Sequence, residues 1–172
     1  MVKYIVRIFC FALFVSFFFA CKCDTGESTI IYLVRHAEKV GKLDSLSEKG
    51  VQRTKDLKNT MGQANLDAVF STKYERTMNT AQPISKALGL TTINYDPSKL
   101  TDLVELVKNE YQGKRILIVG HSNTTPSLAN LFVPGAELPN ISESEYDKLY
   151  NIIYNQCCPS ALIELGYGAS SP

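Results

Sequence analysis

The sequence is poor in several features that mark particular classes of protein. Histidine occurs twice and tryptophan not at all among its 172 residues, and no tract is repetitive or of low complexity. The formal net charge of +1 gives no strongly basic field, which argues against nucleic acid as a partner. No CxxC pair or Cys/His spacing typical of a zinc site occurs. These absences argue against a repeat protein, a nucleic-acid-binding protein and a zinc domain.

The overall composition is that of a folded domain. Hydrophobic residues make up 45% of the chain and charged residues 20%, a balance that argues against disorder. A length of 172 residues is enough for one domain with a hydrophobic core.

A long apolar run lies at the N-terminus, outside the expected domain. Lys3 and Arg7 precede it, and the 13 residues 8–20 are too short for a comfortable membrane span but fit a signal peptide. Ala20 followed by Cys21 resembles the cleavage site of a bacterial lipoprotein. We therefore expect a signal peptide at 1–20, a lipid on Cys21, a tether at 21–28, and export to the bacterial cell envelope with lipid anchoring to the membrane. Simple secretion and an uncleaved anchor are the alternatives.

The five cysteines fall into three groups. Cys10 would leave with the signal peptide and Cys21 would carry the lipid. Cys23, Cys157 and Cys158 then remain, an odd number for an exported protein. One disulfide from Cys23 to either Cys157 or Cys158 is expected in an oxidising compartment.

Strands alternate with helices over residues 29–172, which we expect to form one domain. The expected strands lie at 29–34, 67–71, 90–95, 115–119, 151–154 and 161–165. The expected helices lie at 47–61, 72–88 and 98–111, from Thr124 or Thr125 onward, and at 143–150. This alternation predicts an α/β fold, a three-layer α/β/α sandwich with a mostly parallel central sheet.

Local signals predict where two of these helices begin and end. Ser47 fits an N-cap, and Thr72 with Glu75 three residues later fits a capping box. Pro83 should kink or divide the second helix, and Gly89 should end it.

The polar residues that follow the strands form a candidate site. Arg35 and His36 follow the first strand, Arg76 lies early in the second helix, and His121 and Ser122 follow the fourth strand. In open α/β sheets the carboxyl ends of the strands meet at the edge where ligands bind. Arginine forks suit phosphate oxygens, and a neutral histidine in such a cationic pocket can attack phosphorus. The set therefore predicts phosphoryl chemistry.

Four segments, in the right order, resemble those of the histidine phosphatase superfamily, the phosphoglycerate mutase-like family. They are Arg35-His36-Ala37-Glu38, residues 46–50 (LSEKG), residues 71–81 (STKYERTMNTA) and residues 119–122 (VGHS). The resemblance implies a phosphoglycerate mutase-like fold and a metal-independent, cofactor-free acid phosphatase. It also implies that His36 forms a phosphohistidine, that Arg35, Arg76 and His121 bind the phosphoryl group, and that Ser122 is a pocket hydroxyl.

The acid that protonates the leaving group in many members of this family has no clear counterpart. Asp96, Asp102 and Glu105 lie near the expected spacing, but Asp102 and Glu105 also fit a solvated helix face, and Asp96-Pro97 also fits a turn. Small members such as the phosphohistidine phosphatases manage without this acid. Without it, the protein should favour good leaving groups, including phosphoramidates.

Other polar residues near these segments have a structural interpretation. Glu38 and Lys39 are expected as loop charges, and Tyr146, Tyr150 and Tyr154 as packing and surface residues.

The leading function is hydrolysis of small phosphorylated substrates, and three alternatives accompany it. A phosphoglycerate mutase-type transferase would need extra segments to close over its intermediate, and a mature domain of this size has little chain to spare. A metal-dependent phosphoesterase would use His36, His121, Glu38 and Asp96, but they lack metal-ligand spacing and two arginines would repel the metal. A non-catalytic lipoprotein that binds a phosphorylated ligand is the third. Loops at 40–46 and 131–144 would set specificity, and the sequence gives no prediction of oligomeric state.

Overall fold

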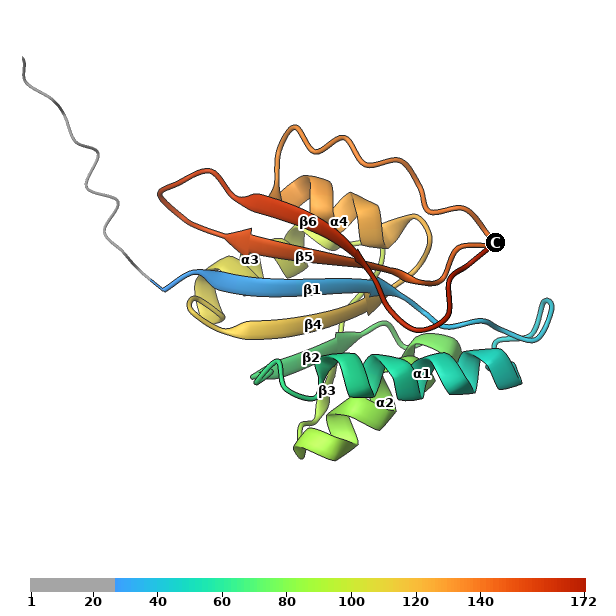
Figure 1. The fold of residues 1–172 in the computed structure, drawn as a ribbon. Coiled ribbons are helices and arrows are strands. Elements are labelled where there is room, and N and C mark those ends of the chain that lie inside the picture. Colours follow the sequence, from blue (N-terminus) through green and yellow to red (C-terminus); the bar gives the residue numbers. More distant parts are fainter. Residues whose placement is uncertain (1–26) are drawn as a thin grey trace, which may run out of the picture.

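Six strands form a single central sheet in the computed structural model, which describes residues 27–172 (Figure 1). The strands are β1 (Thr29–Arg35), β2 (Ala68–Ser71), β3 (Thr92–Asn94), β4 (Arg115–Gly120), β5 (Lys148–Tyr154) and β6 (Ala161–Gly166). The helices are α1 (Glu48–Met61), α2 (Glu75–Leu88), α3 (Leu100–Glu110) and α4 (Thr124–Phe132). The sheet order is β3-β2-β4-β1-β5-β6. Strands β1 to β4 are parallel to one another, and β5 pairs antiparallel with both β1 and β6.

Helices cover both faces of the sheet, as the predicted three-layer sandwich requires. Side chains alternate along β4, so Ile116 and Ile118 pack in the core with α3 and α4. Leu117 and Val119 point to the other face and pack with α1 and α2. Because all four are fully buried or nearly so, β4 is a central strand with an unbroken apolar run, as expected for a strand covered on both faces.

The register between β1 and β4 places the two histidines side by side. These strands are parallel, and Arg35 at the end of β1 pairs with Gly120 at the end of β4. His36 and His121 each follow by one residue, and the backbone N–H of His36 donates to the carbonyl of Gly120 at 2.9 Å. The convergence predicted at the carboxyl edge of the sheet is therefore present.

Two of the predicted helix signals are confirmed and one is wrong. Ser47 caps α1 by accepting a hydrogen bond from the backbone N–H of Gly50, and Gly89 ends α2 in the left-handed conformation. The capping box is wrong, because α2 begins at Glu75 after Tyr74 and the Thr72 hydroxyl bonds other partners. Pro83 lies inside α2 without dividing it.

The predicted helix at 143–150 is also wrong. Residues 143–147 are not helical, and β5 begins at Lys148 and pairs with both β1 and β6. Alternate residues Tyr150 and Ile152 are buried in the core, so the segment has the period of a strand. Tertiary pairing here overrides the local helical signal.

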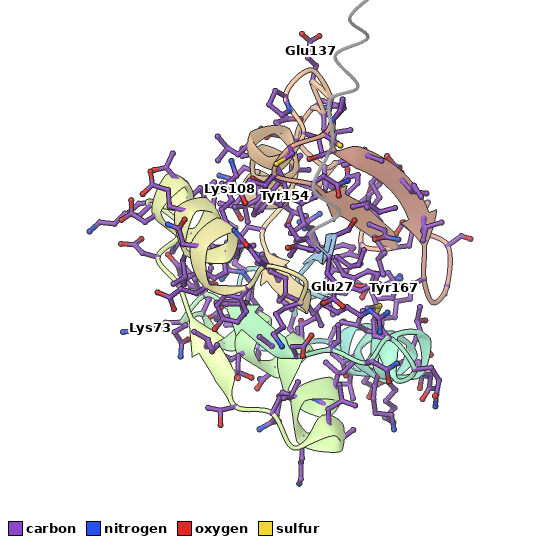
Figure 2. The ribbon with its side chains drawn as sticks, turned by 90° about the vertical axis from the view of Figure 1, so that its left-hand side faces the viewer. Glu27, Lys73, Lys108, Glu137, Tyr154 and Tyr167 are labelled. Carbon is purple, nitrogen blue, oxygen red and sulfur yellow. The ribbon has the colours of Figure 1, made fainter. Side chains whose placement is uncertain are left out.

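Tyr154 and Tyr150 are packing residues, as predicted. The ammonium group of Lys108 on α3 lies 5.3 Å from the centre of the Tyr154 ring, and Figure 2 shows the two side chains together. Tyr150 is buried in the core.

The predicted signal peptide, the lipid on Cys21 and almost all of the tether lie outside the described residues. Cys158 is disulfide-bonded. Its predicted partner, Cys23, also lies outside the described residues, so that pairing stays a prediction. Within residues 27–172, none of the helices is long and apolar enough to cross a membrane.

Candidate active site

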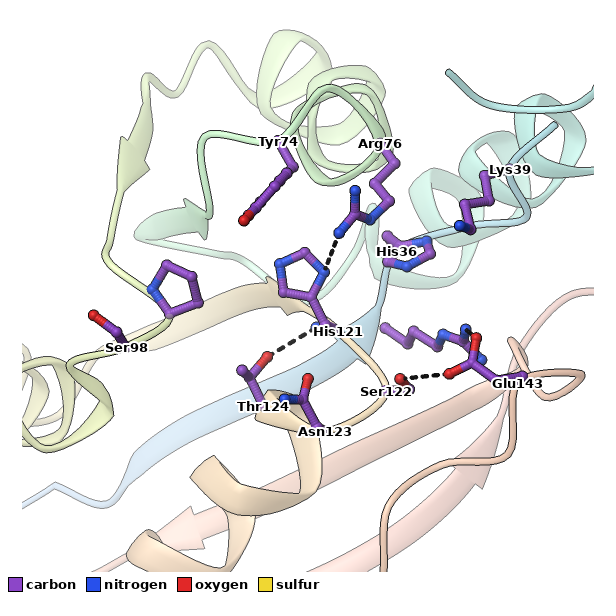
Figure 3. Close-up of a pocket in the computed structure, with 12 residues that line it drawn as sticks. His36, Lys39, Tyr74, Arg76, Ser98, His121, Ser122, Asn123, Thr124 and Glu143 are labelled. Carbon is purple, nitrogen blue, oxygen red and sulfur yellow. Dashed lines mark hydrogen bonds and ion pairs between the residues drawn. The ribbon is translucent and has the colours of Figure 1, made fainter. Parts of the chain in front are cut away.

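The predicted site residues lie around one cleft at the carboxyl edge of the sheet (Figure 3). Arg35 ends β1, Arg76 lies in the first turn of α2, and His121 follows β4. The ring centres of His36 and His121 are 5.7 Å apart. The cleft has a volume of about 490 Å³ and is lined by Arg35, His36, Lys39, Tyr74, Arg76, Pro97, Ser98, His121, Ser122, Asn123, Thr124 and Glu143.

His36 is buried and held in one tautomer. Its Nδ1 lies 2.8 Å from the carbonyl oxygen of Ala37, and since a carbonyl only accepts, Nδ1 carries the proton. In the neutral ring Nε2 then keeps its lone pair. Burial, with Arg35, Arg76 and His121 nearby, lowers the pKa of His36 to about 4 against the opposing hydrogen bond to Ala37. At neutral pH the side chain is therefore an uncharged base.

His121 has the opposite tautomer in this structure. Arg76 Nη2 lies 3.2 Å from Nδ1, and because a guanidinium only donates, Nδ1 is the acceptor. Nε2 then donates to Thr72 Oγ1 at 3.1 Å. Burial first, and then the charge of Arg76, lowers the pKa of His121 to about 4. Both histidines are thus neutral at pH 7.

Arg35 is almost completely buried and faces the loop between α4 and β5. Its Nη1 donates to the carbonyl oxygens of Ser142 and Glu145 at 2.7 and 2.9 Å, and its Nη2 donates to Glu143 Oε2 at 2.9 Å. The guanidinium lies 4.2 Å from the centre of the Tyr146 ring. Its buried Nε has no hydrogen-bond partner among the described residues, so it is a donor that an anion in the cleft could use.

Arg76 is fixed by three neighbours. It forms an ion pair with Asp44 through Nη1, contacts His121 through Nη2, and stacks with its guanidinium 4.4 Å from the centre of the Tyr74 ring. Asp44 also accepts a hydrogen bond from the backbone N–H of Glu75, the first residue of α2. This loop carboxylate therefore places both the arginine and the helix that carries it.

The threonines of α2 connect the two histidine loops. Thr77 bonds the Thr72 hydroxyl at 2.7 Å, and Thr72 in turn bonds His121. Thr80 accepts a hydrogen bond from the backbone N–H of Ala37, next to His36, at 2.9 Å. In the Arg-Thr-x-x-Thr segment, Thr77 thus contacts the residue that bonds His121, and Thr80 contacts the loop that carries His36.

Close backbone contacts explain the glycines of the other two segments. A Cβ on Gly50 would lie 2.1 Å from the carbonyl oxygen of Glu38. A Cβ on Gly120 would lie 2.9 Å from the hydroxyls of Thr124 and Thr125.

Glu38, which is expected to be a loop charge, has a structural partner. Its carboxylate accepts three hydrogen bonds from the buried Arg53 at 2.8 to 2.9 Å. Desolvation acts against the charge of Arg53, but the contacts with Glu38 outweigh it and raise the pKa of the guanidinium. The pair ties the loop after β1 to α1.

The three predicted candidates for the acid are absent from the cleft wall. Asp102 and Glu105 lie on α3 and do not line the cleft, which fits a helix face. Asp96 accepts hydrogen bonds from the backbone N–H and hydroxyl of Ser98, which lower its pKa, and it does not line the cleft. Among the described residues that line the cleft, Glu143 is the one carboxylate.

Sequence reasoning missed several side chains at the site. Tyr74 lies within a matched segment, which was a usable signal, but its contact with His121, 5.1 Å between ring centres, depends on the fold. Asp44 and Glu143 lie in loops far along the chain from their arginines. Tyr146, expected only to pack, lies against Arg35 and 6.0 Å from His36 between ring centres.

The charges of the cleft favour a tetrahedral anion. Two guanidinium groups and two neutral imidazoles face it, and Lys39 adds a further cation to the lining. Over residues 27–172 no group of three or more His, Cys, Asp or Glu side chains could hold a metal ion.

Comparison with known proteins agrees with this geometry. A family model described as the histidine phosphatase superfamily (branch 1) matches residues 31–98. No curated protein matches the chain. The protein histidine phosphatase SixA, solved with tungstate, is similar at 14% identity and a TM-score of 0.65, covering 80% of this chain and 96% of SixA.

Two further solved structures share the fold. YhfR from Bacillus stearothermophilus has 16% identity and a TM-score of 0.66, covering 82% of this chain and 98% of its own. A mycobacterial glucosyl-3-phosphoglycerate phosphatase complexed with VO3 has 12% identity and a TM-score of 0.65, covering 81% of this chain and 99% of its own. These two matches show that the chain shares their fold. The resemblance to the histidine phosphatase superfamily that four sequence segments predict is thus confirmed by a family model over residues 31–98 and by the fold of about four fifths of the chain.

Proposed function

We propose that this protein is a metal-independent phosphatase that hydrolyses small phosphate monoesters or phosphoramidates through a phosphohistidine on His36. The observation that carries the proposal is the hydrogen bond from His36 Nδ1 to the Ala37 carbonyl. It leaves a free lone pair on Nε2 of a neutral, buried ring that lies beside two arginines.

In the first step His36 Nε2 attacks phosphorus and the bond to the leaving group breaks. Arg35 and Arg76 neutralise charge on the equatorial oxygens, because phosphoryl transfer depends mainly on positioning and electrostatic stabilisation. The Nε of Arg35 has no other partner among the described residues and would donate to one of these oxygens. His121 and Ser122 would contact the others from the start of α4, where backbone amides favour an anion.

In the second step water attacks phosphorus, the P–N bond breaks and phosphate leaves. A mutase-type transferase would have to keep water away from the phosphohistidine. The Glu143 side chain, with 79% of its surface exposed, shows that the cleft is open on the side of the α4–β5 loop. This openness favours hydrolysis over transfer.

The test is a phosphatase assay with trapping of the intermediate. The wild-type protein should release phosphate from an aryl phosphate in the presence of EDTA and carry acid-labile label on His36 after a rapid quench with a 32P-labelled substrate. His36→Ala should abolish both. Normal turnover by His36→Ala would refute the nucleophile, and tight phosphate binding without any turnover by the wild type would favour the non-catalytic alternative.

We also propose that the protein is exported and anchored in the bacterial envelope by a lipid on Cys21. The positively charged start, the short apolar run and the Ala20-Cys21 pair support this proposal. The full-length chain should fractionate with membranes and incorporate labelled fatty acid, and Cys21→Ala should lose the label. Labelling that persists in Cys21→Ala would refute this site.

A further inference from the structure

Glu143 is held at the mouth of the cleft by two residues of the site. Its Oε2 accepts from Arg35 Nη2 at 2.9 Å, and its Oε1 accepts from the Ser122 hydroxyl at 3.0 Å. Figure 3 shows Glu143 beside Ser122, across the cleft from Tyr74. The carboxylate comes from the α4–β5 loop, which also contacts Arg35 through the backbone carbonyls of Ser142 and Glu145 and the ring of Tyr146.

His36 and Glu143 both line the cleft but differ sharply in their exposure to solvent. His36 is 4% exposed and lies deep in the cleft, whereas the Glu143 side chain is 79% exposed. In-line attack by a buried nucleophile sends the leaving group away from it, toward solvent. A carboxyl group at the mouth therefore lies on the side toward which the oxygen or nitrogen departs, whereas Asp96, Asp102 and Glu105 do not line the cleft.

The contacts of Glu143 also indicate how substrate binding would lead it to take up a proton. The hydrogen bond from Ser122 and the charge of Arg35 keep the pKa of the carboxyl low in this structure. A bound phosphoryl group would compete for Arg35 and Ser122 and bring its own negative charge close to the carboxylate. Both effects raise the affinity of a carboxylate for a proton.

We propose that Glu143 is the acid that protonates the leaving group, and the base that activates water in the second step. In the first step the Nε2–P bond forms, the P–O bond breaks, and the Glu143 proton passes to the leaving oxygen. In the second step the water oxygen bonds phosphorus, the P–N bond breaks, and the water proton returns to Glu143. This assignment rests on the proposed phosphatase function and gives its reaction the missing acid.

The experiment uses the full chain and compares Glu143→Gln with the wild type on two substrates. One is p-nitrophenyl phosphate, whose leaving group needs little protonation, and the other is an alkyl monophosphate, whose leaving group needs it. Glu143→Gln should lose about 100-fold or more in kcat on the alkyl phosphate, the range for a lost general acid, and less than about tenfold on the aryl phosphate. Glu137→Gln is the matched control, because Glu137 lies in the same loop, projects into solvent (Figure 2) and does not line the cleft.

Three results would overturn the assignment. Equal losses on both substrates would mean that Glu143 only positions Arg35, and no loss on either would mean that it has no part in the reaction. A lower KM with unchanged kcat on both would mean that it merely blocks the phosphate site. The proposed function is judged separately by trapping on His36 in the wild type, which does not depend on Glu143.

Discussion

The backbone N–H of Ala37 donates a 2.9 Å hydrogen bond to the hydroxyl of Thr80, which lies 43 residues further along the chain. Thr80 donates in turn to the carbonyl of Arg76 at 2.6 Å. The same Ala37 residue accepts the hydrogen bond from His36 Nδ1. One threonine hydroxyl thus connects Ala37, the residue whose carbonyl orients the imidazole, to the helix turn that carries the arginine.

Thr80→Val should therefore impair both stability and activity. The substitution keeps the side-chain shape but leaves the buried Ala37 N–H without an acceptor, which costs about 1–3 kcal/mol. Because Ala37, which Thr80 fixes through its N–H, holds His36 through its carbonyl, kcat should fall by about tenfold or more, whereas Thr80→Ser keeps the hydroxyl and should retain most activity. Denaturant unfolding and steady-state kinetics on the two variants check this. A Thr80→Val protein with wild-type kcat would show that the hydrogen bond does not orient the nucleophile.

Gly50→Ala should destabilise the fold at the contact between α1 and the loop after β1. The new Cβ would lie 2.1 Å from the Glu38 carbonyl oxygen, so the backbone has to shift, at a cost of about 1–3 kcal/mol or more. Gly166→Ala on β6 is the control, because no atom lies within 4 Å of the added Cβ, and it should change stability by less than about 0.5 kcal/mol. Equal unfolding free energies for the two variants would contradict the contact.

These residues show which parts of the molecule could be predicted from sequence. The strands of the core are continuous apolar runs, such as Ile116 to Val119, and the spacing of the matched segments places His36, Arg76 and His121 at one edge. The hydrophobic periodicity of the strands and the order of the matched segments along the chain are what make these features predictable. Thr72 shows the limit, since its local signal is a helix cap, yet its hydroxyl bonds Thr77 and His121.

The carboxylates of the site were beyond local reasoning. Asp44 and Glu143 are loop charges. Asp44 pairs with an arginine 32 residues away in the sequence, and Glu143 with one 108 residues away. Nothing in the residues around either one distinguishes it from a solvated charge. The segment that carries Glu143 also has a helical pattern that strand pairing overrides. The position of the Glu143 side chain at the cleft could therefore not be predicted from the sequence.

The stability of the protein should fall as the pH drops from about 6.5 to about 4. The folded-state pKa of His36 and of His121 is about 4, below the ordinary value of 6.5, so the unfolded chain binds more protons in this range. The neutral histidines therefore contribute fully above pH 6.5, and their contribution is lost as the pH falls. At pH 4.5 the loss should be roughly 2–3 kcal/mol for each histidine.

Denaturant unfolding at pH 7.0, 5.5 and 4.5 measures this dependence. The chain has two histidines, so a double variant, His36→Gln with His121→Gln, should show a much flatter profile over the same range. A wild-type profile as flat as that of the double variant would mean that the two rings are not held neutral.

Arg76→Lys should lose about 100-fold or more in kcat/KM while the protein stays folded. The guanidinium makes an ion pair with Asp44, contacts His121 Nδ1 and stacks on Tyr74 at the same time, and an ammonium group offers neither the planar fork nor the stacking surface. The loss corresponds to about 3 kcal/mol of transition-state stabilisation, the scale for one preorganised donor. Arg115→Lys, at the exposed start of β4, is the control and should keep wild-type kinetics. If Arg76→Lys stays within a few fold of the wild type in kcat/KM, the fork is not what stabilises the transferring phosphoryl group, and the charge of the side chain alone is sufficient.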